Sequence, residues 1–477
     1  EIYTRIIREY PDSGFVPDAW VSFGEYYFGE QQLELALKAY KKAAAYPKPE
    51  VQGFAEYKLG WVYYNLGDFA ESCLHFQRVM KLAADVQAQG HKKFTLDREA
   101  RKDWVTAYSH FGNADTAFER IRRIAPEYVR PMAANLADRW IDAGRDKEAS
   151  GLLEDLIANG DSDPLLPSYY AKQLRAVQRL FSKDQVVDRV GKIVTRLQGM
   201  DEPSGEQASK AWSQSLDEVD LGLRRIGTLW HQDAVKLKNE ALMSQAEKIY
   251  ALYLSLFADR DEAYEIRFYH AESLYALGRF ADAGAEYHAT VLANEKGEFS
   301  ADAALEMVRS YDKLSAIATA NKEPQNSEEA KERNGKMIDA CRLYLRLAPT
   351  GDMAATAHFR IGRAHYDRDE FQPALASFET LLGAGNNEAE DGVLQVSPEL
   401  AEVAANLILD IYNYRKDWRK IIERARGFVE DPRFKDNRGF IEKTTELADG
   451  ASFKVRSLDL AGKPHEEVAE GYLTYVR

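Results

Sequence analysis

A small residue recurs along this chain in a constant setting of apolar side chains. Gly24 and Gly60 stand 36 residues apart, and each is followed three residues later by a tyrosine. Ala271 and Gly362 open the same pattern further along the chain. Self-similarity at a fixed period is typical of stacked supersecondary units, so we expect repeated pairs of helices. The recurring positions are Trp20, Phe23, Gly24, Tyr27, Ala36, Tyr40 and Ala43; then Leu59, Gly60, Tyr63, Gly67, Phe69, Ser72, Phe76 and Val79; then Ala271, Leu274, Gly278, Phe280, Ala283 and Tyr287; and finally Ile361, Gly362, His365, Phe371, Ala374 and Phe378.

Elementary packing accounts for this pattern. A small residue on one helix lets its partner approach closely, whereas a larger side chain would hold the two helices apart. Gly67 and Gly278 fall where a first helix must end and reverse, and glycine adopts a positive φ without steric cost. Unrelated amphipathic helices in a bundle are the alternative, but they would not need aromatic residues in phase with small ones at four places.

These residues resemble the tetratricopeptide repeat, a two-helix unit of about 34 residues. The resemblance implies an all-α fold, a right-handed superhelical α-solenoid of paired antiparallel helices, with about ten or eleven pairs. Polar, proline-containing stretches are expected to form loops at residues 201–210, 321–330 and 383–399. We expect an N-terminal array over residues 1–163, a divergent helical middle over 164–260, and a C-terminal array over 261–477.

Length and charge restrict the class of protein. The chain has 477 residues, too many for one hydrophobic core, and 45% of them are hydrophobic, as in soluble, folded proteins. Its 77 acidic and 63 basic residues give a net charge of −14. This balance argues against nucleic acid as the main partner, because phosphate binding needs a basic face, and it is compatible with a basic protein partner. No apolar run approaches the roughly 18–20 residues that cross a bilayer, so we expect no transmembrane segment.

Catalytic and metal-binding patterns are missing from the sequence. It has no His-Glu-x-x-His, no glycine-rich loop followed by Lys and Ser or Thr, and no Gly-x-Ser-x-Gly. His358 and His365 lie about two helical turns apart, too far to share a metal, and His365 is interpreted as a packing residue. Cys73 and Cys341 form neither a disulfide framework nor a metal pattern, and we expect buried, unreactive thiols. The sequence therefore predicts no enzyme activity, no metal and no cofactor.

The resemblance also implies where a partner would bind. In a tetratricopeptide solenoid the first helices line a concave groove, and the second, fifth, ninth, twelfth and thirteenth positions of each unit face it. Around Gly60 three of these positions hold the large rings Tyr57, Trp61 and Tyr64, and such rings anchor peptide or helical partners. The candidate groove residues are Phe54, Tyr57, Trp61, Tyr64, Asn65, Phe268, Tyr275, Phe359, Arg363 and Tyr366.

Other interpretations of the three rings Tyr57, Trp61 and Tyr64 stay open. A tightly coiled solenoid would pack them on neighbouring first helices, and an exposed apolar patch would serve self-association. Stacking on a carbohydrate is a third possibility. One known groove chemistry is missing. The tetratricopeptide domains that hold chaperone C-termini use Lys at the fifth and Asn at the ninth position, where this chain has Phe359 and Arg363, for example.

The first 28 residues, EIYTRIIREYPDSGFVPDAWVSFGEYYF, resemble bacterial envelope tetratricopeptide proteins, among them outer-membrane-assembly partners and periplasmic cell-wall coordinators. The resemblance implies a location in the periplasm or at the outer membrane, with the cytoplasm as the alternative. The chain begins without Met and ends within an apolar-periodic stretch, so we expect a piece of a longer protein. We expect a non-catalytic protein–protein interaction scaffold of a larger complex. The alternative is the partner- or substrate-recruiting region of a larger enzyme or regulator with its catalytic domain elsewhere.

Overall fold

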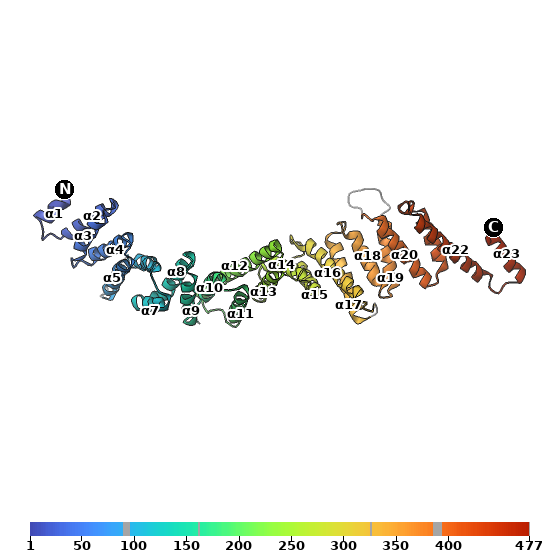
Figure 1. Ribbon diagram of the computed structural model, residues 1–477, viewed down its shortest axis with the longest axis horizontal. Coiled ribbons are helices and arrows are strands. Elements are labelled where there is room, and N and C mark those ends of the chain that lie inside the picture. Colours follow the sequence, from blue (N-terminus) through green and yellow to red (C-terminus); the bar gives the residue numbers. More distant parts are fainter. Residues whose placement is uncertain (89–95, 161–162, 325–326, 385–393, 477) are drawn as a thin grey trace. The chain divides into compact units, whose positions relative to one another are not determined.

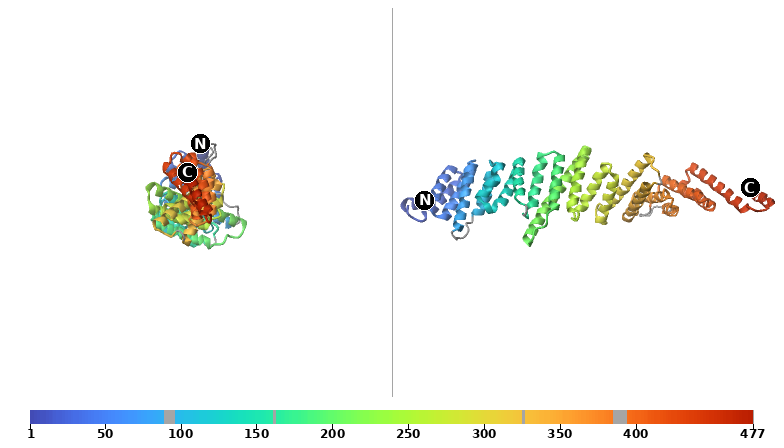
Figure 2. Two further views of the ribbon diagram at one scale, coloured as in Figure 1. Left: turned by 90° about the vertical axis from the view of Figure 1, so that its right-hand side faces the viewer. Right: turned by 90° about the horizontal axis from the view of Figure 1, so that it is seen from below.

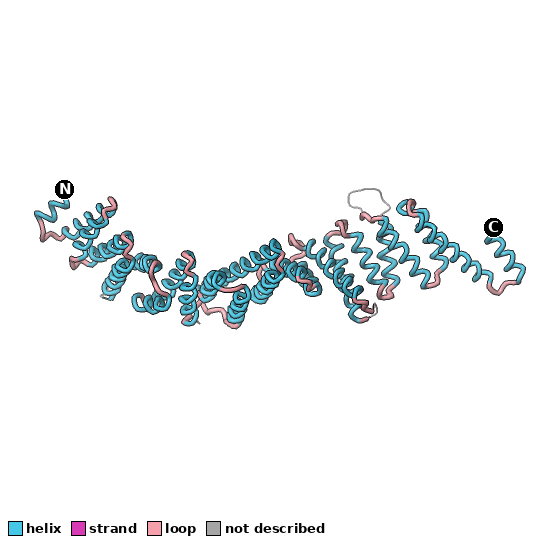
Figure 3. Tube along the Cα trace, in the orientation of Figure 1, coloured by secondary structure: helices cyan, strands magenta, loops and turns pink. Residues whose placement is uncertain are grey.

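The computed structural model describes residues 1–88, 96–160, 163–324, 327–384 and 394–476. Within these ranges the protein consists of 23 α-helices and two short 3-10 helices, without a strand (Figure 3). The all-α prediction is confirmed.

The helices divide between two compact units, Glu1–Leu229 and Trp230–Arg477, and the division falls inside helix α12. In chain order (Figure 1) they are α1 (Ile2–Glu9), α2 (Val16–Gly29), α3 (Leu33–Ala44), α4 (Pro49–Asn65), α5 (Phe69–Ala88), α6 (Asp97–Ser109), α7 (Ala114–Ile124), η1 (Pro126–Tyr128), α8 (Val129–Asp142), α9 (Asp146–Ala158), α10 (Leu166–Leu180), α11 (Lys183–Gln198), α12 (Glu206–Leu237), α13 (Glu240–Phe257), α14 (Ala263–Ala276), α15 (Phe280–Ala293), α16 (Ser300–Ala320), α17 (Glu328–Leu347), α18 (Ala354–Tyr366), α19 (Phe371–Ala384), α20 (Pro398–Tyr414), α21 (Trp418–Glu430), η2 (Pro432–Phe434), α22 (Arg438–Leu460) and α23 (His465–Val476).

Helices α2 to α23 follow one another as eleven consecutive pairs, in agreement with the predicted ten or eleven. We call the even-numbered helix of a pair its first helix and the odd-numbered one its second helix. Within each unit most consecutive helices pack side by side, as α4 does on α5 and α14 on α15 (Figure 2, right). The protein is therefore an all-α helical-repeat solenoid. The handedness of its superhelix and the division at residues 163 and 260 stay predictions.

Glycine on the first helix makes room for an aromatic ring of the second. A Cβ at Gly60 would lie 2.5 Å from Phe76 Cε1, and one at Gly362 would lie 2.5 Å from Phe378 Cε1. Both rings are fully buried. Since real Cβ atoms do not approach carbon so closely, the helix–helix distance in these pairs depends on glycine.

The turn from first to second helix has one recurring geometry. At seven turns a residue with positive φ stands two positions before the second helix begins, as Gly67 does with a φ of 81°. The N–H of the next residue then donates to the carbonyl five residues back, for example Asp68 to Tyr63 at 2.9 Å. This is the Schellman ending of a helix, which satisfies carbonyls that would otherwise lack a partner. The seven residues are Gln31, Gly67, Gly144, Lys238, Gly278, Asp369 and Lys416.

The same turn locates pairs whose sequence departs from the pattern. Lys238 marks the turn between α12 and α13, inside the middle region that the sequence leaves without a clear repeat. Lys416 marks the turn between α20 and α21, where Leu409 occupies the small-residue position of the first helix. Ala425 stands on the second helix, at the place of the aromatic ring. Both are buried in one cluster, so the large and the small residue have exchanged helices.

The predicted loops are confirmed only in part. Residues 325–326 and 385–393, within two of them, lie outside the described residues. In the stretch 201–210 helix α12 already begins at Glu206, directly after Gly205, so the prediction of a loop over its second half is wrong. The residues after Gly205 are good helix formers, and the proline stays outside the helix. Over the described residues, no helix combines the length and the apolar character needed to cross a membrane.

Candidate functional site

The candidate groove residues lie on three first helices. Five of them are on α4 in the first unit, two are on α14 and three are on α18 in the second unit. All are partly accessible, and Asn65 and Arg363 are exposed. The structure therefore brings them together within each helix, and whether they line one groove stays a prediction.

The rings of α4 reach the next first helix, α6. The Tyr57 hydroxyl donates to Asp103 at 2.6 Å, and the Tyr64 hydroxyl lies 3.0 Å from His110 Nε2. Burial and the bond to Asp103 raise the pKa of Tyr57 to about 12. Trp61 packs edge-on against Tyr64 with ring centroids 5.3 Å apart. The three rings thus form a half-buried surface whose hydroxyl groups are held by α6.

The two remaining α4 candidates have local partners. The Asn65 side chain donates to the Trp61 carbonyl at 2.8 Å, which continues the end of the helix. Phe54 lies under Lys58, whose Nζ is 5.3 Å from the ring centroid and 2.8 Å from Glu25.

One position, directly after the small residue of the first helix, differs between pairs. Glu25 of α2 accepts a hydrogen bond from the Tyr40 hydroxyl of α3, and Glu272 of α14 accepts one from Tyr287 of α15. Burial, together with these carboxylates, raises the pKa of both tyrosines well above the usual value. In these two pairs the carboxylate belongs to the packing of the helices.

In two other pairs this position is released from that bond. The second helix carries Phe76 or Phe378, which has no hydroxyl to donate. The first helix then carries Trp61 or Arg363 in place of glutamate. These side chains therefore do not make the hydrogen bond that Glu25 makes, although Trp61 still packs edge-on against Phe76 with ring centroids 6.1 Å apart, and both are candidate groove residues.

The remaining candidates on α14 and α18 mostly cover the core. Phe268 stacks on Phe299 with centroids 4.8 Å apart, and Tyr275 packs edge-on against Phe280 at 5.1 Å. Phe359 packs on Phe378 at 5.9 Å, and the Tyr366 hydroxyl donates to Asp410 of α20.

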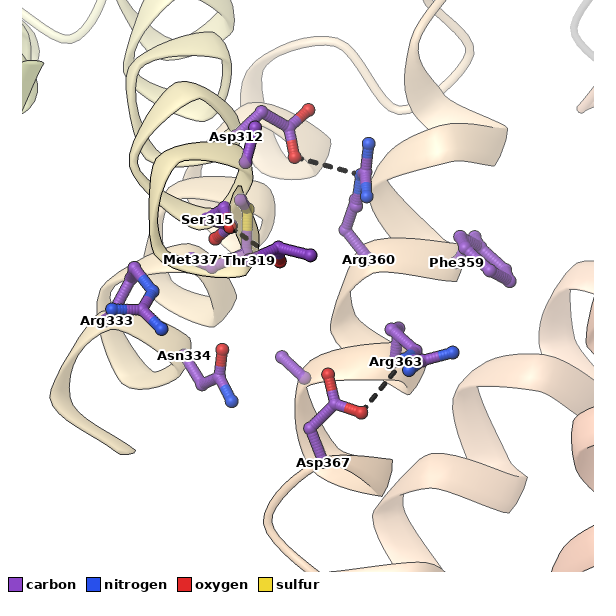
Figure 4. Close-up of a pocket in the computed structure, with 12 residues that line it drawn as sticks. Asp312, Ser315, Thr319, Arg333, Asn334, Met337, Phe359, Arg360, Arg363 and Asp367 are labelled. Carbon is purple, nitrogen blue, oxygen red and sulfur yellow. Dashed lines mark hydrogen bonds and ion pairs between the residues drawn. The ribbon is translucent and has the colours of Figure 1, made fainter. Parts of the chain in front are cut away.

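A pocket of about 400 Å³ lies between α16, α17 and α18, all in the second unit (Figure 4). Phe359 and Arg363 contribute to it, so two of the predicted residues meet there. The other residues of the lining were not predicted from the sequence. The sequence offered one signal for this pocket, namely the spacing of Arg360 and Arg363, which stand three residues apart on one helix. The other lining residues are Asp312, Ser315, Ala316, Thr319, Arg333, Asn334, Met337, Arg360, Ala364 and Asp367.

Charged groups surround this pocket, which we call the α16–α18 pocket. Arg360 Nε lies 3.0 Å from Asp312 Oδ1 on the facing helix, and Arg363 Nε donates to Asp367 at 2.9 Å. Burial raises the pKa of both aspartates, and the neighbouring arginines oppose that rise without cancelling it. Arg333 completes a set of three guanidinium groups and two carboxylates. The lining therefore carries one positive charge, in a chain whose net charge is −14.

Neither of the two cysteines is among the residues that line this pocket. Cys73 and Cys341 are both free and buried, as the sequence predicts. Burial raises the pKa of each thiol to about 12. At neutral pH neither is a thiolate, so neither is a reactive nucleophile.

The imidazole of His270 on α14 lies between a carboxylate of α13 and a carboxylate of α15. His270 Nε2 lies 3.4 Å from Glu247, and its Nδ1 lies 3.8 Å from Glu286. Burial alone would lower the pKa of His270, but the two carboxylates outweigh it and the pKa is raised. The side chain of Arg279 adds a second cation 3.0 Å from Glu247. Among the described residues no group of three or more His, Cys, Asp or Glu could hold a metal ion.

Comparison with known proteins finds one segment that matches a repeat family. Residues 54–85 match the tetratricopeptide repeat family, and they cover most of α4 and α5. Comparison with the curated proteins gives no match. The fold and this match support the tetratricopeptide repeat superfamily, while the bacterial envelope type stays a prediction.

Solved structures give only distant similarity. Naa15/Naa10 bound to HypK-THB matches at 11% identity and a TM-score of 0.30, over 94% of this chain and 62% of that one. BtubC (BKLC) from P. vanneervenii matches at 14% identity and a TM-score of 0.25, over 60% of this chain and 95% of that one. The APC/C hetero-tetramer Cut9-Hcn1 matches at 12% identity and a TM-score of 0.28, over 94% and 99%. Similarities this low carry no argument about function.

Proposed function

We propose that this chain is a non-catalytic scaffold that binds segments of partner proteins through its first helices, within a larger complex of the bacterial cell envelope. The observation that carries the proposal is the position after the small residue. Its side chain makes a hydrogen bond to the second helix in two pairs, as Glu25 and Glu272, and lacks that bond in two others, as Trp61 and Arg363. A repeat whose packing residues recur while its accessible residues vary is suited to binding different segments at different pairs.

Two further observations support protein partners. Aromatic and arginine side chains are the residues that most often dominate binding energy at protein interfaces. The pocket at α16–α18 is large enough for one side chain of a partner and is lined by few apolar residues. The location in the periplasm rests on the resemblance of residues 1–28 to envelope proteins. The net charge of −14 would attract a basic partner at long range.

Crosslinking followed by mass spectrometry in the producing cells tests the proposal. We expect Trp61→Ala and Arg363→Ala each to lose crosslinks to a partner that the wild type recovers reproducibly. Tyr26→Ala and Arg426→Ala are matched controls, because both side chains are exposed and neither is a candidate groove residue. If all four folded variants recover the same partners in the same amounts, the first-helix faces do not bind them. Recovery of cytoplasmic partners only would contradict the envelope location.

A further inference from the structure

The α16–α18 pocket contains guanidinium groups with unused donors. Arg360 and Arg363 each face their aspartate through Nε. Their terminal Nη atoms have no hydrogen-bond partner among the described residues. Arg360 and Arg363 are 40% and 47% exposed, so these donors are accessible from solvent. A terminal guanidinium edge of this kind is suited to binding a planar carboxylate.

Helix α17 forms one wall of the pocket, and two neighbouring residues on it carry hydrogen-bond donors without an acceptor. Arg333 Nε and the Asn334 side-chain amide are buried, and neither has a hydrogen-bond partner among the described residues. Arg333 is only 15% exposed, and its other contact is to Glu323 at 3.2 Å, outside the pocket lining. Buried donors without acceptors are costly, and in this lining they outnumber the one buried acceptor without a hydrogen bond, Asp312 Oδ1, which lies in an ion pair with Arg360 Nε. A ligand that accepts hydrogen bonds would correct this imbalance.

Charge limits the ligand to a single negative charge. Three arginines against Asp312 and Asp367 sum to plus one for the lining residues, and Arg333 also pairs with Glu323 outside the lining. A monoanion neutralises this charge, whereas a dianion such as a phosphoryl group would meet two carboxylates whose pKa is already raised by burial. Met337 and Phe359 provide apolar walls beside the charged groups, which suits the methylene stem that precedes a side-chain carboxylate.

We propose that the α16–α18 pocket binds one aspartate or glutamate side chain within a partner segment (Figure 4). The inference rests on the proposed function and adds the chemistry of one contact. The carboxylate lies against the terminal Nη atoms of Arg360 and Arg363, and its stem lies between Met337 and Phe359. Because the pocket is positive within an acidic protein, an otherwise basic partner segment would place its acidic residue here.

The test uses random twelve-residue peptides displayed within a loop, so that none has a free C-terminus, selected on the immobilised wild-type chain. We expect the selected peptides to share one Asp or Glu position. For the best peptide, replacing that Glu by Gln should weaken binding to the wild type about tenfold, as a charge-assisted hydrogen bond predicts. On Arg363→Gln the same replacement should change binding less than about twofold, while the control Arg426→Gln behaves like the wild type.

A second variant separates this role from a structural one. Asp367→Asn removes a negative charge from the lining, so it should strengthen binding of the acidic peptide about three- to fivefold. A merely structural role of the Arg363–Asp367 pair would weaken binding instead, which would overturn the inference. Selected peptides without a shared acidic position would also overturn it, and so would enrichment only with a free C-terminal carboxylate. In those cases the proposed function stands. Failure to select any peptide would overturn the proposed function as well.

Discussion

The glycine at position 60 should be the residue that sets the distance between α4 and α5. Its added Cβ would lie 2.5 Å from Phe76 Cε1, and carbon atoms in contact prefer at least about 3.5 Å. The helices must then separate by about 1 Å, because Phe76 is fully buried and its ring has no open space to turn into. We therefore expect Gly60→Ala to destabilise this helix pair.

The magnitude follows from two opposing effects. Overpacking a buried contact costs about 1–3 kcal/mol, and exchanging glycine for alanine inside a helix gains about 1 kcal/mol. Ala271 stands at the same place opposite Tyr287, so a helix pair can be built around a Cβ there. The difference leaves a net loss of about 0–2 kcal/mol, and we expect about 1 kcal/mol. The matched control is Gly191→Ala in α11, where a Cβ meets nothing within 4 Å and should gain about 1 kcal/mol.

Hydrogen exchange measured by mass spectrometry reads each helix pair separately, which suits a repeat protein that need not unfold in one step. Amides of α4 and α5 should exchange about fivefold faster in Gly60→Ala, and amides of α11 about fivefold slower in Gly191→Ala. Adding Phe76→Leu to Gly60→Ala should recover part of the loss, because the smaller side chain leaves room for the Cβ. If Gly60→Ala protects α4 and α5 as Gly191→Ala protects α11, the close approach of the ring is not what requires glycine.

Three other outcomes follow from the structure. Asp369→Gly should stabilise the α18–α19 turn by up to about 1 kcal/mol, seen as slower exchange there, because its φ of 58° is strained for a residue with a Cβ. Faster exchange would contradict this. The raised pKa of His270 adds stability that is complete below the ordinary histidine pKa and is lost as the pH rises through the raised value. Protection factors of α13–α15 should therefore be lower at pH 9 than at pH 6, and His270→Gln should remove that difference. Cys73 and Cys341 should not react with a thiol reagent at pH 7.5 in the folded protein, and two thiols should react after unfolding in urea. Reaction of either thiol in the folded protein would contradict the buried placement.

The sequence predicts the helix pairs where a small residue and a ring stand in the usual order. In the pair around Leu409 and Ala425, which Tyr412, Trp418 and Ile421 indicate in the sequence, this order is missing, because the large and small residues have exchanged helices and only their combined volume is kept. Some turns between the first and second helices could not be predicted from the sequence either. Glycine indicates the turn in the sequence at Gly67 and Gly278. Lys238 and Lys416 adopt the same positive φ, but lysine is not a residue from which such a turn can be predicted.

The candidate site was harder to predict, because partners across helices are distant in sequence. Tyr57 is held by Asp103, 46 residues away, and no period along the chain relates the two. The α16–α18 pocket likewise needs Asp312 and Arg333 on helices that precede Arg363. Its existence depends on α16 and α17 being longer than α18, a difference that apolar spacing within one helix does not reveal.

The net charge of the chain favours a basic partner, whereas the local charge of the α16–α18 pocket favours an acidic side chain. One partner segment can meet both requirements. Long-range attraction depends on the sum over the chain, which is −14. Contact specificity depends on a few atoms within hydrogen-bonding distance, where salt and solvent screen least. In the α16–α18 pocket these atoms are guanidinium donors, because each aspartate meets only one edge of its arginine. A basic partner segment with one well-placed acidic residue would therefore satisfy both conditions, whereas a uniformly basic segment would be attracted to the protein and then excluded from this pocket.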